Sequence, residues 1–164
     1  MSPFEKGSIL SSGDGIMSKI IKTYYSSIIS SINSVGIVVS DVIGNIQASF
    51  GPLEECSQFE LTVVLNELVL NAIKHGNKED ESKRVKIKAG VTDNGFACLI
   101  VEDEGYGYDF DCLCKSKADC AVEEDIFSVM ESGRGILIVK NLCDQVKVND
   151  KGNKIVVLKK LKHY

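Results

Sequence analysis

The chain has 164 residues, of which 44% are hydrophobic, and its formal net charge at pH 7 is −4. This length and hydrophobic content fit one ordinary globular domain with a core of its own. The negative charge argues against a direct nucleic-acid partner, because proteins that bind polyanions carry a basic footprint. The short pairs Lys83-Arg84 and Lys159-Lys160 are offset by nearby acids and are interpreted as solvated surface.

The N-terminal third is predicted to be largely helical. Residues 1–15 offer at most an edge strand and a loop. A stripe of apolar residues then recurs at helical spacing: Ile20, Tyr24, Ile28, Ile32 and Val35. A second helical pattern covers residues 38–46 and is stopped by Gly51-Pro52. A third helix is expected over residues 57–75, with Gly76-Asn77 as its C-cap.

No segment is typical of a signal peptide or a membrane span, so a cytoplasmic protein with no membrane partner is expected. Residues 23–40 are uncharged, which is long enough to consider a membrane helix. Serines, Asn33 and Gly36 interrupt this stretch, which favours a soluble amphipathic segment.

The pattern then changes to the period of strands. Alternation over residues 85–89 predicts a half-buried strand, Asp93-Asn94-Gly95 is a hairpin signal, and residues 96–103 form the returning strand. Residues 135–143 are predicted to be helical. A second hairpin is expected from residues 145–148 and 154–161.

These elements predict an α+β fold, a two-layer sandwich with helices on one face of a mixed, mostly antiparallel sheet. A single domain is expected over residues 1–164, with residues 1–52 as an N-terminal strand and helical region. Residues 108–132 form a long, acidic and mostly irregular connection. A connection of that length in a compact domain is usually functional or mobile.

The six cysteines indicate free thiols, because disulfide scaffolds are usually shorter and poorer in core. Three lie in apolar stretches and are expected to be packed: Cys56, Cys98 and Cys143. Three others lie close together, at Cys112, Cys114 and Cys120, but no fourth zinc ligand is evident. Whether this second group binds a metal or senses redox state stays open.

The helix over residues 57–75 is apolar nearly all round, apart from one polar strip. At 100° per residue, Asn71 lies about 40° from Glu67, and Lys74 about 20° to its other side. A helix this apolar belongs in the core, where a carboxylate needs a strong partner. The strip is either partly exposed, with a Glu67–Lys74 contact, or it lines a pocket that holds a cation and a polar ligand.

Two later motifs favour the pocket. In LIVEDEGYG, the period of two places Asp103 on the core-facing side at the end of a strand. Gly105 and Gly107 then permit a tight turn and close backbone approach. A carboxylate in this position can accept a hydrogen bond from an exocyclic amine such as that of adenine, although the same pattern also describes an ordinary turn.

The second motif is ESGRGILIV, residues 131–139. Ser132 can cap a helix whose first N–H groups, at Gly133 and Gly135, are exposed to bind an anion. Arg134 can add a charge-assisted contact to phosphate. Neither motif is a Walker loop or a Rossmann fingerprint.

In this order, the segments LNELVLNAIKHGN, VEDEGYG and SGRGILIVKNLCDQV resemble the Bergerat-type ATP-binding fold, and within it the anti-sigma-factor serine kinase branch. The likeness covers about residues 55–160, while the first 50 residues match only in being helical. It implies ATP and Mg²⁺ as cofactors and residues 108–132 as an ATP lid.

The resemblance also implies roles for single residues. Asn71 would ligate Mg²⁺, Glu67 would act as general base toward the acceptor hydroxyl, and Asp103 would bind the adenine amine. Two glycine pairs would complete the ATP site: Gly105 and Gly107 at the adenine, and Gly133 and Gly135, with Arg134, at the phosphates. His75 also fits the family phrase, as a helix-end or a catalytic histidine.

The function implied is a protein serine/threonine kinase and anti-sigma factor. It would phosphorylate a STAS-type anti-sigma-factor antagonist, bind a sigma factor, and form a homodimer. Two alternatives remain: a nucleotide-dependent binding switch without kinase activity, and a detached histidine-kinase catalytic domain. Only His75 and His163 are present, and neither lies in a recognisable phosphoacceptor helix.

Overall fold

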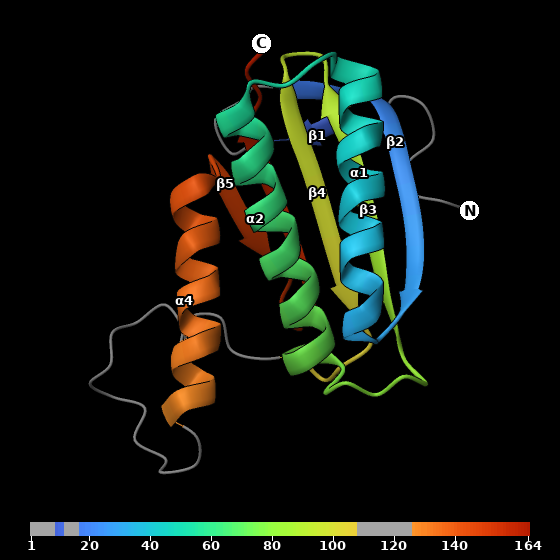
Figure 1. Ribbon diagram of the computed structural model, residues 1–164, viewed down its shortest axis with the longest axis vertical. Coiled ribbons are helices and arrows are strands. Elements are labelled where there is room, and N and C mark those ends of the chain that lie inside the picture. Colours follow the sequence, from blue (N-terminus) through green and yellow to red (C-terminus); the bar gives the residue numbers. More distant parts are fainter. Residues whose placement is uncertain (1–8, 12–16, 108–125) are drawn as a thin grey trace.

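A computed structural model of the protein describes residues 9–11, 17–107 and 126–164. In this part of the chain, helices cover one face of a six-stranded sheet (Figure 1). The strands are β1 (Ile9–Ser11), β2 (Met17–Ile29), β3 (Arg84–Thr92), β4 (Phe96–Asp103), β5 (Gln145–Val148) and β6 (Lys154–Lys160). The helices are α1 (Val35–Phe50), α2 (Glu55–Asn71) and α4 (Ile126–Leu142), with a short 3-10 turn at Ile32–Ser34 and a π-helical segment at Ala72–Gly76.

The predicted two-layer α+β architecture is confirmed. The strand order is β1-β2-β3-β4-β6-β5, and every strand pair formed by the described residues is antiparallel, whereas a mixed sheet was expected. Both predicted hairpins are present, and their turns contain Gly95 and Gly152 at φ of 82° and 78°. Glycine suits these positions because other residues rarely adopt positive φ.

The main core lies between the sheet and the helices. Alternate residues of β3, β4 and β6 point into it, and α2 contributes Leu61, Val64 and Leu65, each fully buried. The other side of the sheet is called the open face below. It carries the intervening residues of the same strands, including a small second cluster of Ile20, Cys98 and Ile100.

The prediction of a helix over residues 20–35 is wrong, because most of this segment forms β2. Ile20, Tyr24 and Ile28 are spaced by four, and an even spacing also fits a strand, whose period is two. The segment also contains β-branched and aromatic residues, which favour strands: Thr23, Tyr24, Tyr25, Ile28 and Ile29. Pairing along nearly the whole of β3 then decides between the two structures.

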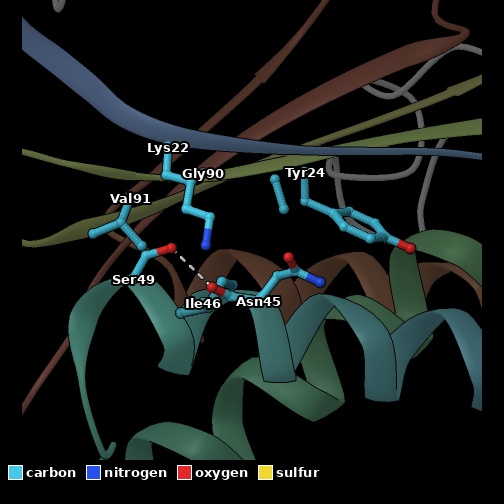
Figure 2. A pocket seen from close by; sticks show the side chains of 8 residues that line it. Lys22, Tyr24, Asn45, Ile46, Ser49, Gly90 and Val91 are labelled. Carbon is cyan, nitrogen blue, oxygen red and sulfur yellow. Dashed lines mark hydrogen bonds between the residues drawn. The ribbon is translucent and has the colours of Figure 1, made fainter.

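A bulge near the start of β2 exchanges the two faces of this strand. The pairing register shifts between Ile20 and Lys22, so Ile20 joins the open face while Lys22 points toward α1. Figure 2 shows the hollow that results, with Lys22 and Tyr24 facing Asn45 and Ser49 of α1. The Ser49 hydroxyl donates to the Asn45 carbonyl at 2.9 Å.

The C-terminal end of α4 is fixed to the rest of the domain by a buried lysine. Lys159 on β6 is 6% exposed. Its ammonium donates to the Glu60 carboxylate of α2 at 2.6 Å and to the Leu142 carbonyl at 2.7 Å. A cation suits this position because the last carbonyls of a helix carry partial negative charge.

The cysteine predictions are confirmed in part. Cys98 is buried, Cys143 is half-buried, and burial raises the pKa of both thiols to about 11. Cys56 is a free thiol but is exposed in the first turn of α2, so the prediction that it packs is wrong. The other three cysteines, Cys112, Cys114 and Cys120, lie outside the described residues. Among the described helices, none is long and apolar enough to cross a membrane.

Candidate functional site

The polar strip on α2 faces α4. Glu67 is half-buried and Asn71 is 7% exposed. Gly135 of α4 lies directly against both residues: a Cβ built there would collide with the Glu67 carboxylate and lie 3.6 Å from the Asn71 side-chain nitrogen. Lys74 is exposed, and no ion pair joins it to Glu67 in the described structure. The strip is therefore enclosed between two helices and is not a surface held by a Glu67–Lys74 contact.

Asn71 has an unsatisfied polar group. Its Nδ2 is buried and has no hydrogen-bond partner among the residues that the structure describes. Buried polar atoms are nearly always paired, so each exception needs an explanation. The Nδ2 is a donor and suits an acceptor such as a phosphate oxygen, whereas the Oδ1 of the same amide and the Glu67 carboxylate are oxygen ligands of the type that Mg²⁺ prefers.

Asp103 lies at the end of β4 on the core side, as predicted, and is 5% exposed. Its Oδ1 accepts a hydrogen bond from the Gly105 N–H at 2.8 Å. Burial raises the pKa of this carboxyl above its ordinary value of 3.8, and the hydrogen bond from Gly105 opposes this rise. Gly76 closes the other side, because a Cβ at that position would collide with the carboxyl.

A small hollow beside Asp103 has mostly apolar walls. Leu68 and Ala72 line it from the helical side, and Val101 and Ile155 line it from the sheet. Mostly apolar walls with one buried acceptor suit an aromatic ring that carries an amino group. The hollow has a volume of about 10 Å³ in this conformation, so it would have to widen to admit such a ring.

The β5–β6 turn closes the same end of the site. Asn153 accepts from the Asp103 N–H at 2.9 Å through its carbonyl and donates to the Asp103 carbonyl at 3.0 Å through its side chain. Gly107, at φ 84°, lies against the Lys151 carbonyl of this turn. A side chain at Gly107 would push the two segments apart.

Sequence reasoning missed the residues that hold the Asp103 turn from behind. Asn77 is fully buried. Its side-chain oxygen accepts from the Glu104 N–H at 2.8 Å, and its Nδ2 donates to the Arg84 carbonyl at 3.0 Å. Gly76 and Asn77 had been interpreted only as a helix cap. The preceding segment Ala72–Gly76 is π-helical, and such segments are frequent at functional sites.

The prediction that Gly133, Arg134 and Gly135 open a helix is wrong. The helix begins at Ile126, so their N–H groups lie in its interior, where N–H groups bond to carbonyls four residues earlier. Apolar residues before Gly133 extend the helical pattern, and an interior glycine costs only about 1 kcal/mol relative to alanine. Arg134 is exposed and Gly135 is buried.

The expected irregular connection over residues 108–132 is corrected at its end, because residues 126–132 belong to α4. Residues 108–125 lie outside the described part of the chain. The assignment of residues 108–132 as an ATP lid therefore stays a prediction.

Gly105→Ala should lower the free energy of unfolding by about 1–3 kcal/mol, the usual cost of overpacking a close contact. The added Cβ would collide with the Gly76 carbonyl, which is backbone and cannot turn away. Gly44→Ala in α1 is the matched control, because nothing lies within 4 Å of its Cβ position, and it should be neutral or stabilising. Urea denaturation measures both variants. Equal effects at the two positions would contradict the close contact at Gly105.

Comparison with known proteins agrees with this geometry. Residues 34–159 match the family described as "Histidine kinase-like ATPase domain". The chain belongs to this family. The match begins at α1 and extends to β6, so it contains both α2 and the Asp103 turn.

Curated relatives place this histidine kinase-like ATPase domain near the anti-sigma-factor kinases. It is 29% identical to the "Serine-protein kinase RsbW" of Bacillus subtilis over 101 residues, which is 62% of each chain. It is 31% identical to the "Anti-sigma F factor" of Clostridium perfringens over 105 residues, 62% of this chain and 71% of that protein. A longer match, 80% of each chain, joins it at 23% identity to the "Serine-protein kinase RsbW" of Staphylococcus epidermidis. The match thus spans less than two thirds of the Bacillus subtilis relative.

Proposed function

We propose that this protein binds ATP with Mg²⁺ and transfers the terminal phosphoryl group to a serine or threonine of a partner protein. The observation that supports the proposal most strongly is the pair of polar side chains on α2: the buried Asn71 amide, whose Oδ1 is a ligand of the type that Mg²⁺ prefers, lies beside the Glu67 carboxylate against Gly135. The names of its relatives, a serine-protein kinase and an anti-sigma factor, support the same activity.

The adenine would occupy the hollow beside Asp103. Leu68 and Ala72 would contact the ring, and Asp103 would accept a hydrogen bond from its amine. Gly105 and Gly107 support this arrangement because both approach neighbouring backbone so closely that no side chain fits. Gly76 and Asn77 would hold the turn in place.

The phosphate end would lie along the strip of α2. Asn71 would hold Mg²⁺, whose charge stabilises the transferring phosphoryl group when it is bound. Glu67 would accept the proton of the attacking hydroxyl. Gly133, Arg134 and Gly135 would contact the phosphates, which requires the helix before Gly135 to open and free its N–H groups.

The proposed substrate is a STAS-type anti-sigma-factor antagonist, and the proposed second partner is a sigma factor. Phosphorylation would add a charge of about −1.5 to −2 to the antagonist and so weaken its complex with this protein. Incubation with radiolabelled Mg-ATP and STAS proteins from the same source tests the proposal. Label on a serine or threonine supports the kinase, and its absence from every STAS protein contradicts it.

One observation favours a second candidate, a nucleotide-dependent binding switch without kinase activity. The backbone of α4 at Gly135 lies directly against the half-buried Glu67 carboxylate, which narrows the approach of a hydroxyl to it in this conformation. A detached histidine-kinase domain receives less support. His163 follows the last strand and stacks on Phe50 at 3.9 Å, and His75 lies in the π-helical segment.

Asp103 should make the protein prefer ATP to GTP, because its carboxylate accepts from an amine but repels a carbonyl oxygen. Asp103→Asn should bind ATP more weakly and lose part of this preference. Competition binding with fluorescent ATP measures both. A wild-type protein that binds ATP and GTP equally would remove Asp103 from the adenine site.

The same preference should depend on pH. Burial raises the pKa of Asp103 above 3.8, so the folded protein takes up this proton at a higher pH than the unfolded chain. Protonation removes the acceptor, and the preference for ATP should therefore decline as the pH falls toward this raised pKa. The Asp103→Asn variant should show no such decline, which separates Asp103 from other carboxylates.

A further inference from the structure

The open face of the sheet is basic, although the whole protein is acidic. Alternate residues of three strands place six basic side chains on it: Arg84, Lys86 and Lys88 from β3, Lys147 from β5, and Lys154 and Lys160 from β6. Among the residues of these three strands and of β4 that point to the open face, one carries a carboxylate, Glu102. The formal net charge of the chain is −4, so the sheet concentrates positive charge that no run of basic residues in the sequence reveals.

The strand register arranges these charges in two neighbouring rows across the sheet. One row runs from Lys86 to Glu102 to Lys154. The next runs from Lys88 through two apolar residues to Lys147. At about 4.8 Å per strand, Lys88 and Lys147 lie about 14 Å apart.

The one carboxylate offsets only part of this charge. Glu102 forms an ion pair with Lys154 at 3.3 Å. The Arg84 side chain bonds to the hydroxyl and the carbonyl of Ser27, which are neutral, and its backbone N–H donates to the Glu104 carboxylate beside it. Lys86 and Lys147 are exposed. A net positive surface that spans four strands therefore remains.

Apolar side chains border the basic rows on the β2 side. Tyr25 is 57% exposed and Ile29 is 44% exposed, and their strand partners are Lys88 and Arg84. The Lys88 ammonium lies 5.9 Å from the centre of the Tyr25 ring. Aromatic and arginine side chains beside one another are typical of protein interfaces.

We propose that the open face docks an acidic segment of a partner protein that also carries apolar side chains. Its carboxylates would pair with Lys86 and Lys147, and its apolar side chains would cover Tyr25 and Ile29. A nucleic acid or an anionic membrane fits less well, because an extended polyanion also meets the net negative charge of the remaining surface. A short bound segment interacts mainly with protein charges within about 10 Å of it, because salt at 0.1 M screens electrostatic interactions over longer distances.

This surface is separate from the proposed ATP site. Asp103 and the strip of α2 lie on the helix side of the sheet, whereas the basic rows lie on the opposite side. A partner docked on the open face would leave the hollow beside Asp103 uncovered. The docking proposal does not depend on kinase activity.

The test uses a fluorescent peptide in which Glu and Leu alternate, with a Gln and Leu peptide as its uncharged counterpart. Fluorescence anisotropy compares the wild type with the double variant Lys86→Glu/Lys147→Glu. The matched control is Lys78→Glu/Lys140→Glu, which changes the net charge equally at exposed lysines on other surfaces. Circular dichroism and ATP binding check that both variants are folded.

The wild type and the control should bind the acidic peptide with similar affinity, and added salt should weaken both complexes. The open-face variant should bind at least about tenfold more weakly, because each reversal replaces an attraction with a repulsion. Equal weakening in both variants would show an effect of net charge alone and overturn the proposal. Preference for the Gln peptide, for a DNA duplex or for phosphatidylserine-containing vesicles over the acidic peptide would also overturn it.

Discussion

Asn71→Ala should abolish Mg²⁺-dependent binding of ATP without destabilising the fold. Loss of a buried amide normally lowers stability, because its partners become unpaired. The Nδ2 of Asn71 leaves no partner behind within the described part of the chain, so truncation should cost little beyond lost packing. Isothermal titration calorimetry with and without Mg²⁺ measures binding, and thermal unfolding followed by circular dichroism measures stability.

Asn66→Ala is the matched control for this prediction. Asn66 lies on the same helix and donates to the Thr62 carbonyl at 2.9 Å, within its own helix and outside the strip that faces α4. Its variant should retain Mg²⁺-dependent binding. Undiminished Mg²⁺-dependent affinity in Asn71→Ala would show that this amide holds no metal.

Glu67→Gln should reduce phosphoryl transfer by at least about tenfold, with nucleotide affinity held within a few-fold. General-base assistance typically contributes ~10²–10⁴-fold, and positioning and charge stabilisation leave a residual rate. Glutamine keeps the shape that fits against Gly135 but cannot accept the proton. Single-turnover transfer from labelled ATP to a STAS protein measures the rate.

Glu55→Gln in the exposed first turn of α2 controls for the loss of one negative charge on this helix. It should transfer at the wild-type rate. If Glu67→Gln also does so, Glu67 is not the base. If the wild type transfers nothing yet binds a STAS protein only with nucleotide present, the binding switch replaces the kinase.

The fold was predictable where a pattern allowed only one structure. The alternation in β3 and the Asp93-Asn94-Gly95 turn fix a hairpin locally, and α2 is long enough for its apolar pattern to be unambiguous. The spacing of Ile20, Tyr24 and Ile28 fits both a helix and a strand, and only pairing with β3, whose partner residues lie 57 to 72 positions later, selects the strand.

Parts of the site were predictable for a similar reason. Glu67 and Asn71 are polar residues on an apolar helix, and Asp103 is an aspartate on the core-facing side of a strand end. All three conflict with the apolar pattern around them, which marks them as site residues. Gly76 and Asn77 show no such conflict, because a glycine and an asparagine are ordinary at a helix end. Their contacts with Asp103 and Glu104 arise only when the helix meets the sheet.

The anchoring of α4 is asymmetric along its length. Its last turn is held by Lys159, which joins the Leu142 carbonyl to Glu60, whereas two glycines, Gly133 and Gly135, weaken its middle by about 1 kcal/mol each. If residues at the start of α4 became helical or lost their helical structure, the last turns of α4 would therefore keep the same register against α2. A change in the length of α4 beside Asn71 would then leave the core packing of its C-terminal half in place.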